Sequence, residues 1–155
     1  MILSAIADNN NNHITKIHKD TNLKLEFIRS KEDIFIKADK WRINQVISNL
    51  LSNAIKFTSE GTVTAAAVPN NDEIVVNITD TGPGIDSEIL PKLFMKFATK
   101  STAGTGLGLF ISKSIIETHG GKIWGKNNHP EGNGATFGFS LPLHNEKFDV
   151  SRELA

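Results

Sequence analysis

A chain of 155 residues with 39% hydrophobic side chains is long enough for one globular core and too short for a comfortable second domain. Its 17 basic and 17 acidic residues cancel, so charge does not favour a nucleic acid or an anionic membrane surface as the main partner, and the absence of cysteine excludes disulfide frameworks and thiolate zinc sites. The apolar runs fall far below the roughly 20 residues that span a bilayer, and the N-terminus lacks the features of a secretory signal. We therefore expect a soluble, cytoplasmic domain, whether or not its parent protein is membrane-anchored.

The first predicted elements are short. Residues 8–12 are typical of the start of a short helix, in which Ile14 and Ile17 would be the buried positions. Residues 23–28 and 34–38 then show alternating apolar side chains on either side of a charged turn. This alternation predicts a β-hairpin.

The strongest predicted helix begins after Asp39, which stands where an N-cap belongs, and continues to about Phe57. Its apolar residues recur at helical spacing and are Ile43, Val46, Ile47, Leu50, Leu51 and Ala54. Two strands are predicted after it, at residues 62–68 and 73–80, joined by a turn that contains Pro69.

The second half of the chain repeats this mixture of helix and strand. A glycine- and proline-containing turn at residues 81–86 leads to another predicted helix at 87–97. A third strong helix is predicted at 107–119, where two glycines end it. Strands at 122–127 and 135–143 close the domain.

This order of elements predicts an α/β protein. We expect a two-layer α/β sandwich, in which a mixed, mostly antiparallel sheet of about five strands carries three main helices on one face. The domain is expected to occupy residues 10–143. Residues 1–9 would be a leader or the remnant of a linker from a preceding domain, and residues 144–155 a polar tail.

Three polar residues share one face of the long predicted helix. Asn49, Asn53 and Lys56 stand at positions i, i+4 and i+7, and asparagine is a poor residue for a helix interior. An ordinary solvated face would account for them. A site in which carboxamide oxygens bind a hard cation and the lysine meets phosphate oxygens would account for them equally well.

Asp80 lies at the end of a predicted strand, on the same face as the apolar residues of that strand. A carboxylate on a core face is costly unless a hydrogen-bond donor meets it. The donor would be either the backbone N–H groups of the following turn or a ligand group such as an exocyclic amine. In the second case Gly82 and Gly84 would let a flat ligand approach the backbone closely.

A glycine-rich segment at residues 104–109 leads into the third strong helix. Backbone N–H groups at such a helix entry can bind an anion. The spacing differs from the dinucleotide-binding fingerprint, and the Gly-Lys-Ser or Gly-Lys-Thr of the common NTPases does not occur. Taken alone, such a glycine-rich segment is more often a flexible connector than a phosphate site.

Together these segments resemble the catalytic domain of sensor histidine kinases. Residues 49–58 resemble its N box, 80–85 its first glycine box, 94–97 its F box and 104–109 its second glycine box, and residues 132–137 are similar to its closing segment. The resemblance covers about residues 10–143, nearly the whole chain, with the motifs in the family's order.

The resemblance implies the Bergerat fold, a two-layer sandwich in which ATP lies between the sheet and a mobile lid. Asp80 would accept a hydrogen bond from the adenine amine, with Thr136 supporting that end. Asn53 would ligate Mg²⁺, Asn49 would line the same stripe, and Lys56 would contact phosphate. Because phosphoryl transfer mainly needs positioning and charge neutralisation, this domain needs no nucleophile or base of its own.

The implied lid extends from residue 94 to residue 106, and Lys100 within it is a candidate for a further phosphate contact. The positions expected to contact the nucleotide are Asn49, Asn53, Lys56, Asp80, Gly82, Gly84, Ile85, Phe97, Lys100, Gly104, Thr105, Gly106, Leu107, Gly108, Leu109 and Thr136. Many family members carry an aromatic residue and an arginine where this chain has Ala98 and Thr99, so the lid departs from the family's pattern there.

The family's phosphoacceptor histidine stands in a helical dimerisation domain and precedes an acidic residue, a pattern that neither His13 nor His18 fits. The resemblance therefore implies transfer to a histidine on the dimerisation domain of the parent kinase, with a response regulator as indirect partner and this domain monomeric by itself. A serine-directed kinase of the same superfamily and a nucleotide-binding module without transfer activity are the alternatives. The superfamily's ATPases use a glutamate where Asn49 stands, and a carboxamide cannot act as a general base.

Overall fold

A computed structural model describes residues 13–17, 22–100, 104–131 and 133–144. The expected leader at residues 1–9, the expected helix start at 8–12 and nearly all of the expected tail lie outside the described residues.

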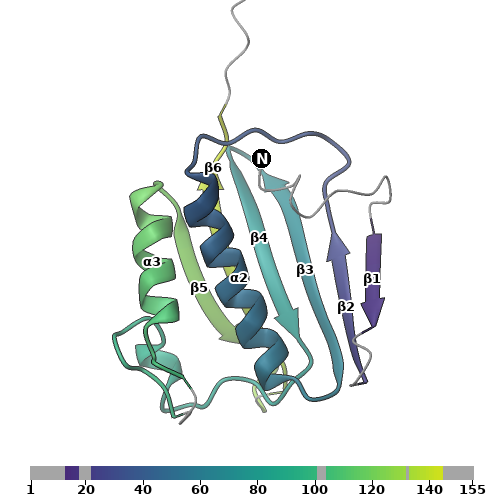
Figure 1. The fold of residues 1–155 in the computed structure, drawn as a ribbon, viewed down its shortest axis with the longest axis vertical. Helices are drawn as coiled ribbons and strands as arrows, with labels where there is room; N and C mark the ends of the chain where they lie inside the picture. The colour runs from purple at the N-terminus through teal and green to yellow at the C-terminus, as the bar shows by residue number, and fades with distance from the viewer. Residues whose placement is uncertain (1–12, 18–21, 101–103, 132, 145–155) are drawn as a thin grey trace, which may run out of the picture.

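The described strands form one six-stranded sheet in the order β1-β2-β3-β4-β6-β5 (Figure 1). The strands are β1 (His13–Ile17), β2 (Leu23–Ile28), β3 (Gly61–Asn70), β4 (Glu73–Asp80), β5 (Lys122–Asn127) and β6 (Ala135–Pro142). Neighbours are antiparallel, except that β2 and β3 are parallel. The expected mixed, mostly antiparallel sheet is confirmed, with six strands in place of about five.

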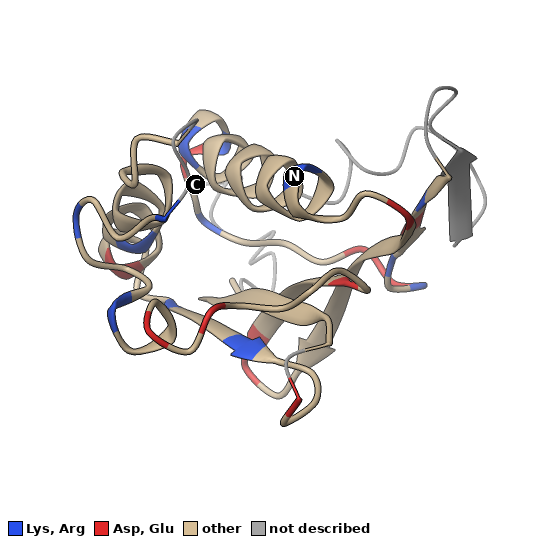
Figure 2. Cartoon of the chain, turned by 90° about the horizontal axis from the view of Figure 1, so that it is seen from below, with Lys and Arg blue, Asp and Glu red and all other residues tan. Residues whose placement is uncertain are grey.

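Two α-helices, α2 (Lys40–Phe57) and α3 (Gly108–Thr118), lie side by side on one face of this sheet, and Figure 2 shows the two layers. The predicted N-cap of α2 is confirmed, because Asp39 Oδ1 accepts hydrogen bonds from the N–H groups of Trp41 at 2.9 Å and Arg42 at 3.1 Å. The helix α2 supplies the crossover that the parallel pair of strands before and after it requires.

The core lies between the two layers. Its fully buried large side chains come from α2, α3 and the inward positions of the central strands, and include Ile43, Val46, Leu50, Val63, Ile74, Val76, Ile78, Ile116, Phe139 and Leu141. On β4 burial alternates strictly from residue to residue. The alternation places Asp80 on the core face, as the sequence predicts.

The predicted helix at residues 87–97 is wrong. The structure has a short 3₁₀ turn there, η1 (Leu90–Lys92), so the described residues form two α-helices and not three. Pro91 gives the physical reason, because a proline inside a helix removes a backbone donor and clashes with the preceding turn.

The predicted N-terminal helix and the predicted hairpin are also wrong. Residues 13–17 form β1, and residues 34–38 form no strand. Both edges of β2 already have partners in β1 and β3, so the chain after β2 returns across the end of the sheet to α2. The alternating Ile34, Ile36 and Ala38 instead pack against the rim of the core.

Within the part of the chain that the structure describes, no helix combines the length and the apolar character that crossing a membrane requires.

Candidate functional site

A cleft of about 460 Å³ opens between α2, the turn after β4, the segment before α3 and the start of α3 itself. Its lining includes most of the positions expected from the sequence, namely Asn49, Asn53, Lys56, Asp80, Gly84, Ile85, Lys100, Gly104, Thr105, Gly106, Gly108 and Leu109. Gly82, Phe97, Leu107 and Thr136 are not among the lining residues. Three segments that are far apart in the sequence therefore share one concave site.

Asp80 forms the buried polar end of the cleft, with 5% of its surface exposed. Its Oδ1 accepts hydrogen bonds from the N–H of Gly82 at 2.9 Å and the N–H of Ala135 at 3.3 Å. Burial raises the pKa of the Asp80 carboxyl, and these two N–H donors offset part of that increase. Its Oδ2 has no protein hydrogen bond among the described residues, so one carboxylate oxygen is available to a ligand donor.

The polar stripe predicted on α2 faces the cleft, and its members have different surroundings. Asn49 Nδ2 donates to Ser112 Oγ on α3 at 3.2 Å. Asn53 is half-buried, and its side chain makes no hydrogen bond with another described residue. Lys56 is exposed, with its ammonium 5.1 Å from the centre of the Phe57 ring. Asn53 and Lys56 thus present polar atoms to the cleft, whereas Asn49 also joins the two helices.

The start of α3 meets both the cleft and the segment before it. A Cβ added at Gly108 would lie 2.3 Å from Asn49 Oδ1, so a larger residue there would have to displace the Asn49 side chain. Leu107 at the N-cap has no side-chain cap, and the first turn carries no acidic residue. The helix therefore offers backbone N–H groups and the positive end of its dipole to an anion.

The backbone of the expected lid crosses directly over Gly106. The N–H of Phe97 donates to Gly106 O at 2.9 Å, and an added Cβ at Gly106 would lie 2.6 Å from Phe97 Cα. Phe97 has a φ of 61°, and its side chain is 69% exposed. The Phe97 side chain therefore points outward, and its backbone holds the glycine-rich segment in place.

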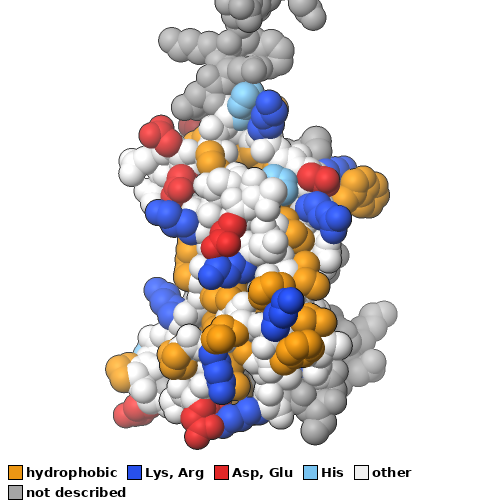
Figure 3. Space-filling model, turned by 90° about the vertical axis from the view of Figure 1, so that its left-hand side faces the viewer, with side chains coloured by type: hydrophobic (Ala, Val, Ile, Leu, Met, Phe, Trp, Pro, Cys, Tyr) orange, Lys and Arg blue, Asp and Glu red, His pale blue; other side chains and the backbone are white. Residues whose placement is uncertain are grey.

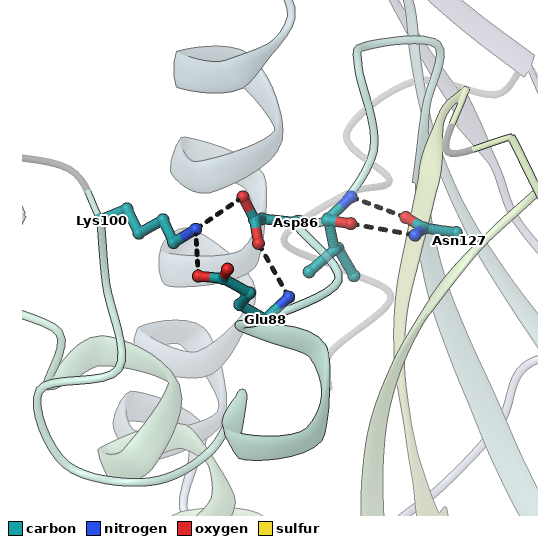
Figure 4. Close-up of polar contacts among 5 residues, drawn as sticks. Asp86, Glu88, Lys100 and Asn127 are labelled. Carbon is teal, nitrogen blue, oxygen red and sulfur yellow. Dashed lines mark hydrogen bonds and ion pairs between the residues drawn. The ribbon is translucent and has the colours of Figure 1, made fainter.

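Lys100 is among the residues that line the cleft, and Figure 4 shows its ammonium between the carboxylates of Asp86 and Glu88. Its ammonium is 2.7 Å from Glu88 Oε2 and 3.0 Å from Asp86 Oδ2. The hydrogen bonds to Glu88 and Asp86 raise the pKa of Lys100. The N–H of Glu88 and the Lys100 ammonium lower the pKa of Asp86. For Lys100 to bind a phosphate group, its ammonium would have to move away from both carboxylates.

Thr136 lies at the same end of the sheet, but its side chain is outside the cleft. Its hydroxyl is 3.0 Å from Thr79 Oγ1 and donates to Asn128 Oδ1 at 2.6 Å. Together with Asn77 these residues line a separate polar groove. The neighbouring Ala135, through its backbone N–H, makes the contact with Asp80.

Several residues of the site were not identified from the sequence. Ser112 is buried and hydrogen-bonded to Asn49. It stands four residues after Gly108, so helical spacing would have placed it on the same face of the helix as Gly108. Asn127 on β5 holds the backbone of Ile85, and no local pattern indicates this contact, because it depends on how distant segments meet.

Comparison with known proteins gives a consistent match. Residues 38–145 match the model of the family described as histidine kinase-, DNA gyrase B-, and HSP90-like ATPase. The sensor protein FixL of Bradyrhizobium diazoefficiens is 37% identical over 132 residues, which cover 83% of this chain and 26% of FixL. The chain spans between 14% and 30% of the length of FixL and further curated relatives.

Solved histidine kinase structures also share the fold. The catalytic domain of the histidine kinase ThkA, in a nucleotide-free form, has a TM-score of 0.69 and 39% identity, and the match covers 78% of this chain and 79% of that domain. Full-length ShkA in complex with AMPPNP has a TM-score of 0.69 and 30% identity, and the match covers 78% of this chain and 26% of ShkA.

Proposed function

The chain belongs to the histidine kinase-, DNA gyrase B-, and HSP90-like ATPase family, and from this premise we propose that it is the ATP-binding catalytic domain of a sensor histidine kinase. It would bind Mg-ATP and donate the γ-phosphoryl group to a histidine on a separate dimerisation domain. The observation that carries the proposal is the cleft itself, which has a buried carboxylate at one end and an asparagine, a lysine and an uncapped helix start around the rest.

The base of the nucleotide occupies the Asp80 end of the cleft. The free Oδ2 of Asp80 accepts a hydrogen bond from the exocyclic amine of adenine, because an amine needs an acceptor and the other carboxylate oxygen is already bonded to the protein. Leu93 and Phe137 provide apolar walls for the ring, and Gly84 keeps the turn free of a side chain.

The triphosphate extends toward α2 and the start of α3. Lys56 contacts phosphate oxygens, and the N–H groups that begin α3 bind them through the helix dipole. The donor set fits Mg²⁺, which takes few protein ligands and several phosphate oxygens, and the Asn53 carboxamide would hold it. The bound cation would neutralise phosphate charge. Within the described residues there is no group of three His, Cys, Asp or Glu side chains that could hold a metal ion without the nucleotide.

In the transfer step a ring nitrogen of the acceptor histidine forms a bond to the γ-phosphorus while the bond from that phosphorus to the β–γ bridging oxygen breaks, so that ADP leaves. The residues of this chain position the phosphates and stabilise their charge, and none of them acts as a base. In ATPases of the superfamily a glutamate activates water at the position of Asn49, and here the Asn49 amide is bonded to Ser112 instead. Phosphoryl transfer is therefore favoured over hydrolysis.

The partner domain would dock beside the lid. Figure 3 shows hydrophobic side chains gathered in the lower half of the face that carries α3, among basic residues. Met95, Phe97 and Ile111 are exposed apolar side chains of the lid and α3. We place the histidine-containing domain of the parent kinase there, with a response regulator acting downstream, this domain monomeric by itself, and the reaction in the cytoplasm.

The test is a transfer assay that mixes this chain with the dimerisation domain of its parent kinase and ATP labelled at the γ-phosphate. We expect an acid-labile, base-stable phosphate on the acceptor histidine, as well as loss of label with Asn53→Ala. Label on a serine would favour the serine-directed kinases. ATP binding without any transfer would favour a nucleotide-binding module.

A further inference from the structure

The last residue of β5, Asn127, binds the backbone of the turn after β4 at two atoms. Its Oδ1 accepts from the N–H of Ile85 at 2.6 Å, and its Nδ2 donates to Ile85 O at 3.0 Å. Figure 4 shows this pair of hydrogen bonds side by side. The Asn127 amide thus gives the N–H and the carbonyl of Ile85 the hydrogen-bond partners that a neighbouring strand would provide.

This contact holds a stretch that has few other supports. Between Pro83 and Ile85, the two hydrogen bonds to Asn127 are the ones that the described residues make. Gly84 has a φ of 85°, a conformation that glycine adopts without strain. All three turn residues line the cleft, on the side where Asp80 lies. Asn127 therefore supplies the hydrogen bonds that hold the backbone of this wall between its two flanks.

The same contact also determines where the next residue lies. Asp86 follows Ile85 directly and holds Lys100 on the opposite side of the turn, 3.0 Å away. Figure 4 shows the two contacts on either side of this short stretch of chain, with Asn127 on the sheet side and Lys100 on the lid side. Asn127 therefore connects the sheet with the carboxylate that faces the lid.

We propose that Asn127 is a positioning residue for nucleotide binding, which fixes the Pro83–Ile85 wall against the adenine base while the phosphate-binding elements remain independent of it. This inference rests on the proposed function. It separates the two ends of the ligand, because the groups assigned to the phosphates come from α2 and α3, whereas the Asn127 amide forms its hydrogen bonds with Ile85. Loss of the Asn127 amide should therefore weaken ATP binding without slowing the transfer step.

The experiment compares Asn127→Ala with the unchanged chain and with Asn70→Ala, which removes an exposed asparagine from the end of β3. The Kd for Mg-ATP is measured by calorimetry, and KM and kcat are measured in the transfer assay with the parent dimerisation domain. For Asn127→Ala we expect Kd and KM to rise about tenfold, as the loss of two modest hydrogen bonds predicts, with kcat within about twofold of the unchanged chain. Hydrogen exchange at the Ile85 N–H should become faster, and Asn70→Ala should change none of these values.

Two results would overturn the inference, namely an unchanged Kd for Mg-ATP in folded Asn127→Ala, or a fall in kcat as large as the rise in KM. If Asn127→Ala does not fold, Asn127→Asp replaces it, because aspartate keeps the shape and the acceptor for the Ile85 N–H but cannot donate to Ile85 O. The same two results then decide. If the unchanged chain binds no ATP, the proposed function is wrong. That result differs from the two results above, in which the unchanged chain binds ATP and only the role of Asn127 fails.

Discussion

Asp80 is a carboxylate that the fold keeps buried although burial opposes its charge. Its pKa is raised by the loss of water, and the N–H groups of Gly82 and Ala135 offset only part of that effect. A buried charge of this kind costs stability in the empty protein, and such a cost is typical of a functional group. We therefore expect stability and nucleotide binding to respond in opposite directions when the charge is removed.

The substitution Asp80→Asn tests this expectation. An asparagine oxygen can still accept from both backbone N–H groups, whereas the side chain loses its charge, so the free energy of unfolding at pH 7 should stay equal or rise. Affinity for Mg-ATP should fall by about 1–3 kcal/mol, because the amine loses a charged acceptor. Calorimetric titration and thermal unfolding measure the two effects, and unchanged affinity would remove Asp80 from the site.

The pH dependence follows from the same shift in pKa. The pKa of Asp80 is higher in the folded state than its ordinary 3.8, so folding favours the protonated form. The contribution of Asp80 to stability is therefore greatest below pH 3.8 and is lost as pH rises through the folded-state pKa. Nucleotide affinity should change in the reverse sense and fall as pH decreases toward that pKa, and this component should vanish in Asp80→Asn.

Most of the site could be predicted from single residues. Asn53 and Lys56 are polar side chains on a predicted helix, and Asp80 is a polar side chain on the apolar face of a predicted strand. Each of them lines the cleft. Asn127 and Thr136 show the limit of such reasoning. Asn127 acts through Ile85, 42 positions away, and the side chain of Thr136 bonds on the outer side of its strand, so only tertiary pairing decides their surroundings.

At the scale of elements, α2 and α3 run in opposite directions (Figure 1) and are in contact with each other. Near the cleft Asn49 bonds to Ser112, and at the far end His119 follows the last turn of α3. His119 Nε2 accepts from the N–H of Asp39 at 3.1 Å, and its Nδ1 lies 2.7 Å from Ile115 O. His119 therefore links the end of α3 to the residue that caps α2.

Replacing His119 with alanine should separate stability from binding. The free energy of unfolding should fall by about 1–2 kcal/mol, because the Asp39 N–H and the Ile115 carbonyl lose a hydrogen-bond partner. Affinity for Mg-ATP should stay within about twofold, since His119 is not among the residues that line the cleft. Chemical denaturation and calorimetry provide the measurements, with exposed His129→Ala as the control. A large loss of ATP affinity in folded protein would show that the far helix contact also shapes the site.

Elements with strong local signals were predicted correctly, and those that depend on their neighbours were not. The capped, periodic α2 and the alternating β4 follow from their own residues. Residues 34–38 alternate in the same way yet form no strand, because β1 and β3 already occupy both edges of β2. Alternation indicates which side chains face the core, but it does not indicate whether the backbone can pair with a neighbouring strand.

At the scale of the whole molecule, the cleft lies where the two layers meet. Its lining comes from α2, from the turn after β4, from the start of α3 and from β6, which are elements spread over most of the described chain. A ligand that contacts all of them would bind the folded state and not the unfolded chain. Binding should therefore raise the stability of the domain as a unit.

This coupling predicts the size of a thermal shift. With Mg-ATP at about 100 times its Kd, the free energy of unfolding should rise by about 2.7 kcal/mol. For a domain of this size that corresponds to a rise in Tm of roughly 5–11 °C. Differential scanning calorimetry measures the shift, and Asp80→Asn at the same ATP concentration should show a smaller one because its Kd is higher. Equal shifts in both proteins would mean that ATP stabilises the chain from a site other than this cleft, since the buried carboxylate would then make no difference to the stabilisation.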